Sequence, residues 1–277
     1  MGEEPETLDA IIITHEHSDH VGGVAVTARK LGIPVYFTEG THRAWMRWIS
    51  PRRQMTYAQW LEQTRKQAAE RQAEAVTEEG EADESDLVEE VEVKPEAVEL
   101  IAPVKEKDPT WLPEVEYFQA GEPFEIGDIT VSPFTIPHDA ADPCGFVFQS
   151  EGLRLAVATD LGYISPNVKA QLKGLDLMLL ESNHDLEMLK DGPYPWAVKQ
   201  RVLSRVGHLS NEAAAGFLEN GYDGQAAYVI LAHLSESNNL PELARVAAER
   251  ALIGRASLMA NRLLLAAQHE PLFPIDF

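Results

Sequence analysis

The sequence predicts an α/β protein in which two β-sheets pack face to face with helices on the outside. Short apolar, β-branched runs typical of buried strands recur along the chain, and segments with helical spacing alternate with several of them. The central part contains alternating runs joined by glycine-containing turns, which are typical of hairpins. These observations indicate layered sheets covered by helices. We expect one domain over the 277 residues, with an insertion at 52–113.

The first elements form a βαβ unit. Residues 8–14 (LDAIIIT) are an apolar, β-branched run that predicts a buried strand. A helix over 21–31 is closed by Gly32, and residues 33–39 (IPVYFTE) predict the next strand, parallel to the first. A short helix over 42–49 precedes a proline.

The insertion differs in composition from the rest of the chain. Residues 56–75 have apolar side chains at helical spacing and predict an amphipathic helix. Residues 70–99 then carry thirteen acidic and two basic side chains, a net charge of -11 out of -22 for the whole chain. Such a segment is too charged to bury itself, and we expect a solvated loop or a lid, the former being favoured.

Strand signals return at residue 115. Two hairpins are expected, with turns at Gly127-Asp128 and Glu151-Gly152, followed by a buried strand over 175–183. The rest of the chain predicts helices over 195–205 and 211–220, a strand in AAYVILAHLS, a helix from Pro241 to about Leu252 and a strand-like C-terminal segment.

Composition restricts the classes of function. The single cysteine, Cys144, excludes an intrachain disulfide and is compatible with a reducing compartment. No apolar run is long enough for a membrane span and no N-terminal signal pattern is present, so we expect a cytoplasmic protein without a membrane partner. A net charge of -22 gives no global attraction for nucleic acid, so any polyanion must be held locally by metal ions and a few cationic side chains.

The motif THEHSDHVGG concentrates chemistry at the end of the first strand. It holds His15, His17, Asp19 and His20, in a chain with nine histidines. Extended residues two apart point to the same side, so the first two histidines can converge on one ion, while Asp19 and His20 can face a second one. Imidazole and carboxylate donors without a thiolate suit zinc, manganese or iron in a site that is not purely structural.

Three later residues also end apolar runs: His138 in TIPHDA, Asp160 in LAVATDLG and His233 in YVILAHLS. Each has an alternative interpretation as a turn or capping residue, but with the first motif they supply enough ligands for two divalent ions. Such a pair can activate a shared water at neutral pH. Two ions, two aspartates and one hydroxide leave a net charge of about +1, which favours an anionic substrate such as a phosphoester.

This series, HxHxDH and then His, Asp and His, resembles the ligand series of the metallo-β-lactamase superfamily. The resemblance implies an αββα sandwich with the site at one edge of the sheets. It implies a first ion bound by His15, His17 and His138, a second bound by Asp19, His20 and His233, and Asp160 as a bridge. The true β-lactamases use a cysteine ligand, whereas Cys144 begins a strand and is interpreted as a small buried residue.

Residues 181–214 and the segments PHDAADPCGF, VATDLG and LAHLSESNN look like those of the YycJ (WalJ) proteins. This resemblance implies a metal-dependent phosphodiesterase, an exonuclease on DNA linked to repair and related to the RNase Z type. Two departures are expected to matter. The family's first strands and a short Asp-containing motif do not precede HxHxDH here, which predicts an exposed sheet edge able to pair with a second copy. The acidic insertion is expected to repel a polyanion unless it swings aside.

Within this hypothesis, Asp19 orients the attacking hydroxide and His208 binds a phosphate or protonates the leaving oxygen. A loop histidine that satisfies backbone carbonyls is an equal alternative for His208. His184 and Asp185 are candidates for substrate binding or for capping a helix. Lys199, Arg201 and Arg205 are interpreted either as contacts to a nucleic-acid backbone or as part of a solvated helix face, the latter being favoured. A hydrolase for a thioester or cyclic phosphodiester, and an inactive truncated metal-binding chain, are the alternative functions.

Overall fold

The computed structural model describes residues 4–50, 108–253, 263–266, 272–275 and 277. The chain divides into two compact units, one formed by residues 1–49 with 109–277 and the other by residues 50–108. The helix expected at 56–75 and the acidic segment that follows it lie outside the described residues. The first unit contains both sheets.

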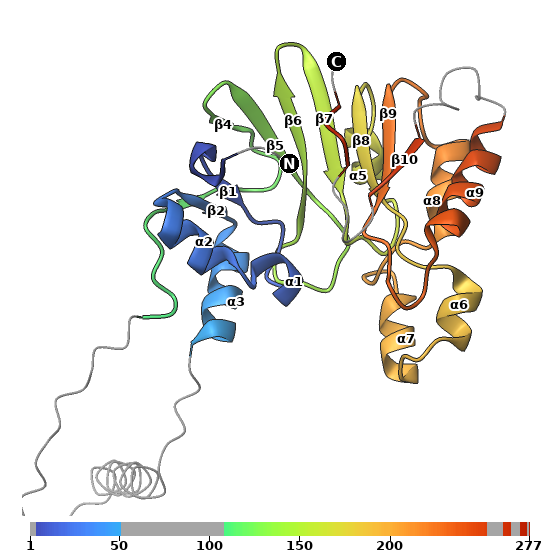
Figure 1. The fold of residues 1–277 in the computed structure, drawn as a ribbon, viewed down its shortest axis with the longest axis horizontal. Coiled ribbons are helices and arrows are strands. Elements are labelled where there is room, and N and C mark those ends of the chain that lie inside the picture. Colours follow the sequence, from blue (N-terminus) through green and yellow to red (C-terminus); the bar gives the residue numbers. More distant parts are fainter. Residues whose placement is uncertain (1–3, 51–107, 254–262, 267–271, 276) are drawn as a thin grey trace, which may run out of the picture. The chain divides into compact units, whose positions relative to one another are not determined.

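Seven strands form the larger sheet, in the order β10-β9-β8-β7-β6-β5-β4 (Figure 1). Neighbouring strands from β4 to β7 are antiparallel, and those from β7 to β10 are parallel. Gly127 and Gly152 adopt left-handed φ angles of 59° and 84° in the turns between β4 and β5 and between β6 and β7, so both expected hairpins are found. The strands are β4 (Phe124–Ile126), β5 (Ile129–Thr135), β6 (Cys144–Ser150), β7 (Leu153–Ala158), β8 (Leu177–Glu181), β9 (Tyr228–Ala232) and β10 (Leu263–Leu265).

The smaller sheet contains three parallel strands, β1 (Ile11–Ile12), β2 (Val35–Phe37) and β3 (Val115–Tyr117), in that order. The first strand is much shorter than the predicted range 8–14. Its pairing is limited because β2 offers only three residues and the chain after Ile13 leaves the sheet to form the histidine-rich loop. Within the described residues β1 pairs with β2 alone, which places it at the edge of this sheet.

The helix predicted over 21–31 is divided in two at Gly22 and Gly23, because glycine is a poor helix former and two in succession favour a break. Among the described residues, no helix combines the length and the apolar character that a membrane span requires. The helices are a 3-10 turn η1 (Pro5–Thr7), α1 (Ser18–Val21), α2 (Val24–Leu31), α3 (Glu39–Ile49), α5 (Pro166–Gln171), α6 (Leu186–Asp191), α7 (Trp196–Val202), α8 (Asn211–Asn220) and α9 (Pro241–Leu252).

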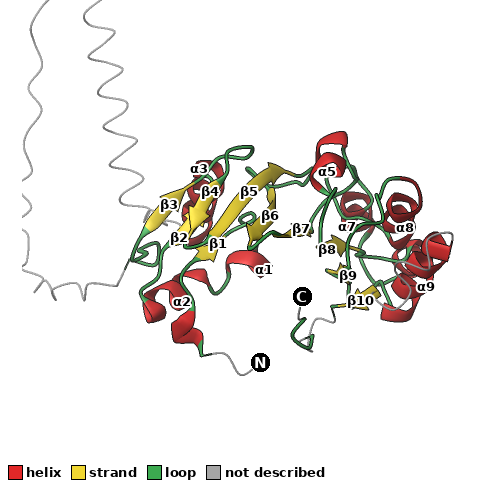
Figure 2. Ribbon diagram, turned by 90° about the horizontal axis from the view of Figure 1, so that it is seen from above, coloured by secondary structure: helices red, strands yellow, loops and turns green. Residues whose placement is uncertain are grey.

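Alternating side chains of the strands build three apolar layers. Val35 and Phe37 point toward a cluster shared with α2 and α3, whereas Tyr36 packs from the other face against a cluster that contains Phe146 of the larger sheet. The next residue, Val147, belongs to a third cluster with α5, α8 and α9. Figure 2 shows α2 and α3 beside the smaller sheet and α5, α8 and α9 beside the larger one. The order is therefore helices, sheet, sheet, helices, which confirms the predicted αββα sandwich.

Candidate metal centre

The histidine-rich loop follows β1 and enters α1. His15 is completely buried, His17 is the residue before α1, and Asp19 and His20 lie inside that one-turn helix rather than in the turn before it. The hydroxyl of Thr14 lies 3.1 Å from His15 Nδ1 and 3.0 Å from His20 Nδ1, so it links the two rings. The Nε2 atom of His15 lies 3.0 Å from His17 Nδ1.

The later candidates gather at one edge of the larger sheet because β5, β7, β8 and β9 run in the same direction. His138 follows β5, Asp160 follows β7, and His233 follows β9. Asp160 and His233 adopt left-handed φ angles of 59° and 55°, a conformation that costs of order 1–3 kcal/mol for a residue other than glycine. Backbone strain of this kind clusters at functional sites, where the fold holds a side chain in a fixed orientation.

The two groups of residues meet. His138 Nε2 lies 3.1 Å from His17 Nδ1, His20 Nε2 lies 3.4 Å from Asp160 Oδ2, and His233 Nε2 lies 3.9 Å from Asp19 Oδ2. Among the described residues, four groups have ligand atoms that all lie within 4.8 Å of one another: His15, His17 and His138; His15, His20 and Asp160; Asp19, His20 and His233; and Asp160, Glu181, His208 and His233. All seven candidate ligands are therefore brought together, and Asp160 groups with His15 of the first trio and with His20 of the trio that contains Asp19.

The donor set fits divalent ions on two observations. The buried Oδ2 atom of Asp160 has His20 Nε2 at 3.4 Å but accepts no hydrogen bond of normal geometry from the described residues, although burial of a carboxylate oxygen is costly unless a partner compensates it. Burial raises the pKa of Asp160, but the adjacent His20 and the charge of His233 outweigh burial and hold this pKa well below its usual range. The site thus contains a buried, ionised carboxylate surrounded by imidazole nitrogens, a donor set that suits zinc or manganese.

The histidines of the site differ in protonation. Burial, with a contribution from the charge of His20, lowers the pKa of His15 to about 3, so this ring is neutral and its nitrogen can act as a ligand. Burial also lowers the pKa of His233, but the ion pair with Asp19 and the hydrogen bond to Glu181 outweigh it and raise this pKa to about 11. An ion that binds His233 must therefore displace a proton.

Glu181, at the C-terminal end of β8, is a residue of this site that the sequence reasoning missed. It is fully buried, and its Oε1 accepts hydrogen bonds from His208 Nδ1 at 2.9 Å and His233 Nδ1 at 2.7 Å. Its Oε2 accepts from the backbone N–H groups of Leu161 and Leu209 at 2.9 and 3.0 Å. A carboxylate in this position fixes the orientation of both rings. The signal that identified Asp160 and His233, a polar residue that ends an apolar strand, also applies to Glu181.

His208 belongs to the cluster through Glu181. Its Nδ1 atom lies 3.8 Å from Asp160 Oδ1, and its ring centroid lies 5.2 and 5.3 Å from those of His138 and His233. Burial lowers the pKa of His208, but the hydrogen bond and charge of Glu181 outweigh it and raise the pKa above its usual value. His208 is thus able to carry a proton near neutral pH.

The contacts of Asp185, His184 and Lys199 point to structural roles. Asp185 is the N-cap of α6, where its Oδ1 accepts from the N–H groups of Glu187 and Met188, and His184 is buried with its Nδ1 atom 3.4 Å from Asn183 Oδ1. Lys199 is buried and donates to the carbonyl of Lys190 at 2.7 Å, so it occupies neither a phosphate contact nor a solvated face.

The remaining two cations keep accessible positions. Arg201 is paired with both oxygens of Asp139, the residue after His138, with an Nη2 to Oδ1 distance of 3.1 Å. The guanidinium of Arg205 lies over the ring of Tyr163, 4.1 Å from its centroid.

Two cavities border the cluster and share Asp19 and His208. One, of about 430 Å³, is lined by Glu16, His17, Ser18, Asp19, Trp48, Asp160, Arg201 and His208. The other, of about 360 Å³, is lined by Asp19, Asn183, Tyr194, Val202, His208, His233, Ser235, Glu236 and Ser237. A ligand held at Asp19 and His208 can therefore extend to either side.

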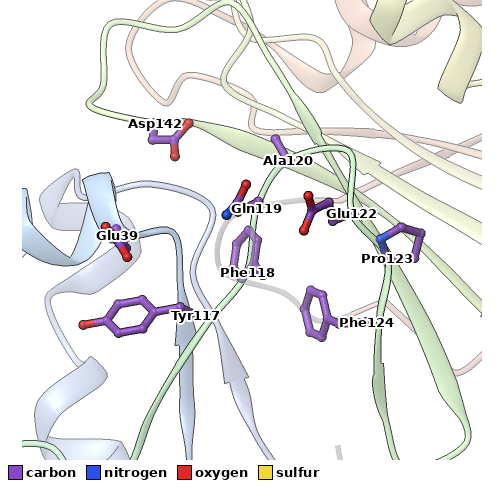
Figure 3. A pocket seen from close by; sticks show the side chains of 9 residues that line it. All are labelled: Glu39, Tyr117, Phe118, Gln119, Ala120, Glu122, Pro123, Phe124 and Asp142. Atoms are coloured by element: carbon purple, nitrogen blue, oxygen red, sulfur yellow. The ribbon is translucent and has the colours of Figure 1, made fainter.

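A larger cavity, of about 560 Å³, lies away from the histidine cluster, and Figure 3 shows its lining. Its charged side chains are the carboxylates of Glu39, Glu122 and Asp142, and no lysine or arginine of the described part of the chain lines it. A polyanion is repelled by such a lining, so the volume of this cavity does not make it the better candidate.

Comparison with known proteins gives matches over most of the chain. A family model described as "Beta-lactamase superfamily domain" matches residues 1–80 and 81–234. The chain is 33% identical over 245 residues to the exodeoxyribonuclease YycJ of Bacillus anthracis, covering 88% of this chain and 71% of that protein. It is 32% identical over 246 residues to the exodeoxyribonuclease WalJ of Streptococcus pneumoniae, covering 89% of this chain and 71% of that protein.

Solved structures share the fold at lower identity. The metallo-β-lactamase fold protein YhfI of Bacillus subtilis has a TM-score of 0.54 and 13% identity, covering 95% of this chain and 76% of that one. The short form of human tRNase Z has a TM-score of 0.50 and 14% identity, covering 99% of this chain and 82% of that one. At such identities the likeness concerns the fold alone.

Proposed function

Because the chain belongs to the metallo-β-lactamase superfamily and is a YycJ-like, metal-dependent hydrolase, we propose that it cleaves phosphodiester bonds of DNA as an exonuclease. The convergence of the seven candidate ligands, including the buried carboxylate of Asp160, carries the metal part of this proposal. Support for the substrate comes from the two exodeoxyribonucleases at 32–33% identity. A DNA exonuclease must act in the compartment that contains the DNA. We therefore extend the proposal to a cytoplasmic role in DNA repair.

The proposal includes two divalent ions, zinc or manganese. One would be held by the first trio, His15, His17 and His138, the other by Asp19, His20 and His233, with Asp160 between them. When bound, such ions supply Lewis acidity and lower the pKa of water. A net charge near +1 in a protein of charge -22 would then confine the attraction for a phosphate to this site.

Two protein groups are assigned to the proton movements. The ion pair with His233 holds the pKa of Asp19 well below its usual range, against the effect of burial, so its carboxylate is an acceptor at neutral pH. This carboxylate lies at the junction of the two cavities and can orient a water for attack on phosphorus.

His208 is placed to assist departure of the leaving group. Because Glu181 occupies its Nδ1 atom, Nε2 is the nitrogen that remains for donation to a phosphate or leaving oxygen. The raised pKa of His208 keeps a proton available at neutral pH, as a general acid requires.

A panel of substrates tests the proposed function. The protein is supplied with Mn²⁺ or Zn²⁺ and offered 5′-phosphorylated duplex DNA, single-stranded DNA, RNA and a thioester. We expect metal-dependent release of nucleotides from DNA and a loss of at least about 100-fold in Asp19→Asn, since a positioned base contributes about 10²–10⁴-fold. The matched control is Asp191→Asn at an exposed position of α6, which should retain activity. Thioester turnover without DNA cleavage would contradict the proposal.

A further inference from the structure

Trp48 is an exposed aromatic residue beside the candidate metal centre. It lies in the last turn of α3 and is 57% exposed, and it lines the 430 Å³ cavity with Asp19, Asp160 and His208. Trp45, one turn earlier on the same helix, is fully buried and stacks on His42. The apolar face of α3 is therefore completed by Trp45 and the residues around it, and packing does not account for an indole in the cavity wall.

The lining of this cavity is otherwise polar or charged. Among the described residues that line it, Trp48 is the one with an extended apolar ring and Arg201 is the one permanent cation. Arg201 is held in place by both oxygens of Asp139 and remains 57% exposed, so its position is set before a ligand arrives. A guanidinium suits a phosphate and an indole suits a flat aromatic base, and a nucleotide combines the two.

The positions of Trp48 and Arg201 relative to Asp19 and His208 suggest the path of a DNA strand through the two cavities. The cavity lined by Trp48 and Arg201 meets the second cavity, lined by Tyr194, at Asp19 and His208. A strand whose cleaved phosphodiester lies at Asp19 and His208 has one nucleotide in the first cavity and continues into the second. The cavity lined by Trp48 and Arg201 has a volume of about 430 Å³, which falls within the range of about 300–1,000 Å³ typical of small-molecule sites.

We propose that Trp48 and Arg201 form a nucleotide-binding subsite, in which the indole stacks on the nucleobase next to the cleaved phosphodiester and the guanidinium contacts a phosphate. This inference rests on the proposed function and deepens it. Because a base must present a free face to the indole, the nucleotide in this subsite is unstacked from one neighbour in the strand. The subsite recognises a base by its flat face, so it tolerates all four bases.

The test compares a single-stranded DNA with the same strand carrying an abasic residue at the cleaved end. Removal of the indole in Trp48→Ala should raise KM for the normal strand by about tenfold or more, because a base stacked on an aromatic residue contributes roughly that factor. The value of kcat should change less than about twofold, and the abasic strand should be cleaved equally well by both proteins. Trp48→Phe, which keeps a ring and its packing, should show a smaller rise in KM.

Matched variants separate stacking from general damage. Trp111 is also 57% exposed but lines none of the cavities described above, so Trp111→Ala should cleave both strands like the unmodified protein. Arg201→Gln should weaken the binding of the normal and the abasic strand to the same degree, since both contain the phosphate. The bound metal content of this variant should stay unchanged.

The outcomes distinguish this inference from the proposed function. Unchanged KM in Trp48→Ala, or an equal loss on normal and abasic strands in both Trp48 variants, overturns the subsite while DNA cleavage stands. Absence of metal-dependent DNA cleavage by the unmodified protein overturns the proposed function and the subsite with it. Binding of the two strands, followed by fluorescence anisotropy with chelator present, gives a readout independent of turnover and should show the same preference for the strand with its base.

Discussion

Replacement of Glu181 by glutamine should weaken both metal binding and the folded state. The carboxylate accepts four hydrogen bonds, two from imidazoles and two from backbone N–H groups. A glutamine amide has one oxygen, so it can serve one of these pairs while its NH₂ group faces the donors of the other pair. No water can replace the lost acceptor without a rearrangement, because the side chain is fully buried.

The size of the effect follows from this count. Two buried donors lose their acceptor, and each costs about 1–3 kcal/mol, so the free energy of unfolding should fall by about 2–6 kcal/mol. His233 and His208 also lose the group that orients them. Loss of such an outer partner typically reduces metal affinity by about 10- to 100-fold.

Both effects are measured on the same preparation. Urea unfolding of the metal-free protein gives the free energy, and competition with a chromophoric chelator gives the affinity for Zn²⁺ or Mn²⁺. Glu122→Gln is the control, because this exposed glutamate lies outside the histidine cluster and its replacement should change the stability by less than about 0.5 kcal/mol. If Glu181→Gln unfolds at the same urea concentration and binds metal as tightly as the unmodified protein, the orienting role is refuted.

Three further predictions follow from single positions. His15→Ala should bind less metal per chain by elemental analysis, and it should lose much of the stabilisation by added metal, which reaches about 2.7 kcal/mol per site at 100 times Kd. Burial lowers the pKa of His184 to about 4. As the pH falls from 6.5 to 4, this imidazole is therefore protonated in the unfolded chain but stays neutral in the folded one. The free energy of unfolding should therefore decline by up to about 3 kcal/mol over that window, and His184→Gln should show a shallower decline in urea titrations. Gly162→Ala should be destabilised by about 1–3 kcal/mol in thermal unfolding, because its Cβ would lie 2.4 Å from the backbone carbon of Arg205 in the loop that follows Asp160.

The sequence alone predicted the chemistry of the site because its signals are local. HxHxDH stands at the end of an apolar run, and His138, Asp160 and His233 each end another one. Strands that run in the same direction end at the same edge, so this pattern was sufficient to predict that all seven side chains converge. The assignment of the ligands to two ions stays a prediction. The αββα order followed in the same way, from periodicity and turn residues, and the structure confirmed it.

Other properties depend on contacts between segments that are distant in the chain. Glu181 orients His208 and His233, which lie 27 and 52 positions away, and no pattern within the strand indicates that its carboxylate serves two rings. Lys199 sits on a helix that looks solvated in the sequence, yet its side chain is buried and its ammonium group donates to the carbonyl of Lys190. Trp48 and Trp45 are alike in sequence, and only the placement of α3 decides which one packs in the core and which one borders the cavity. Residue type and periodicity thus determined which groups lie at the sheet edge, whereas burial, protonation and access depend on distances through space, and the packing of whole elements decided those.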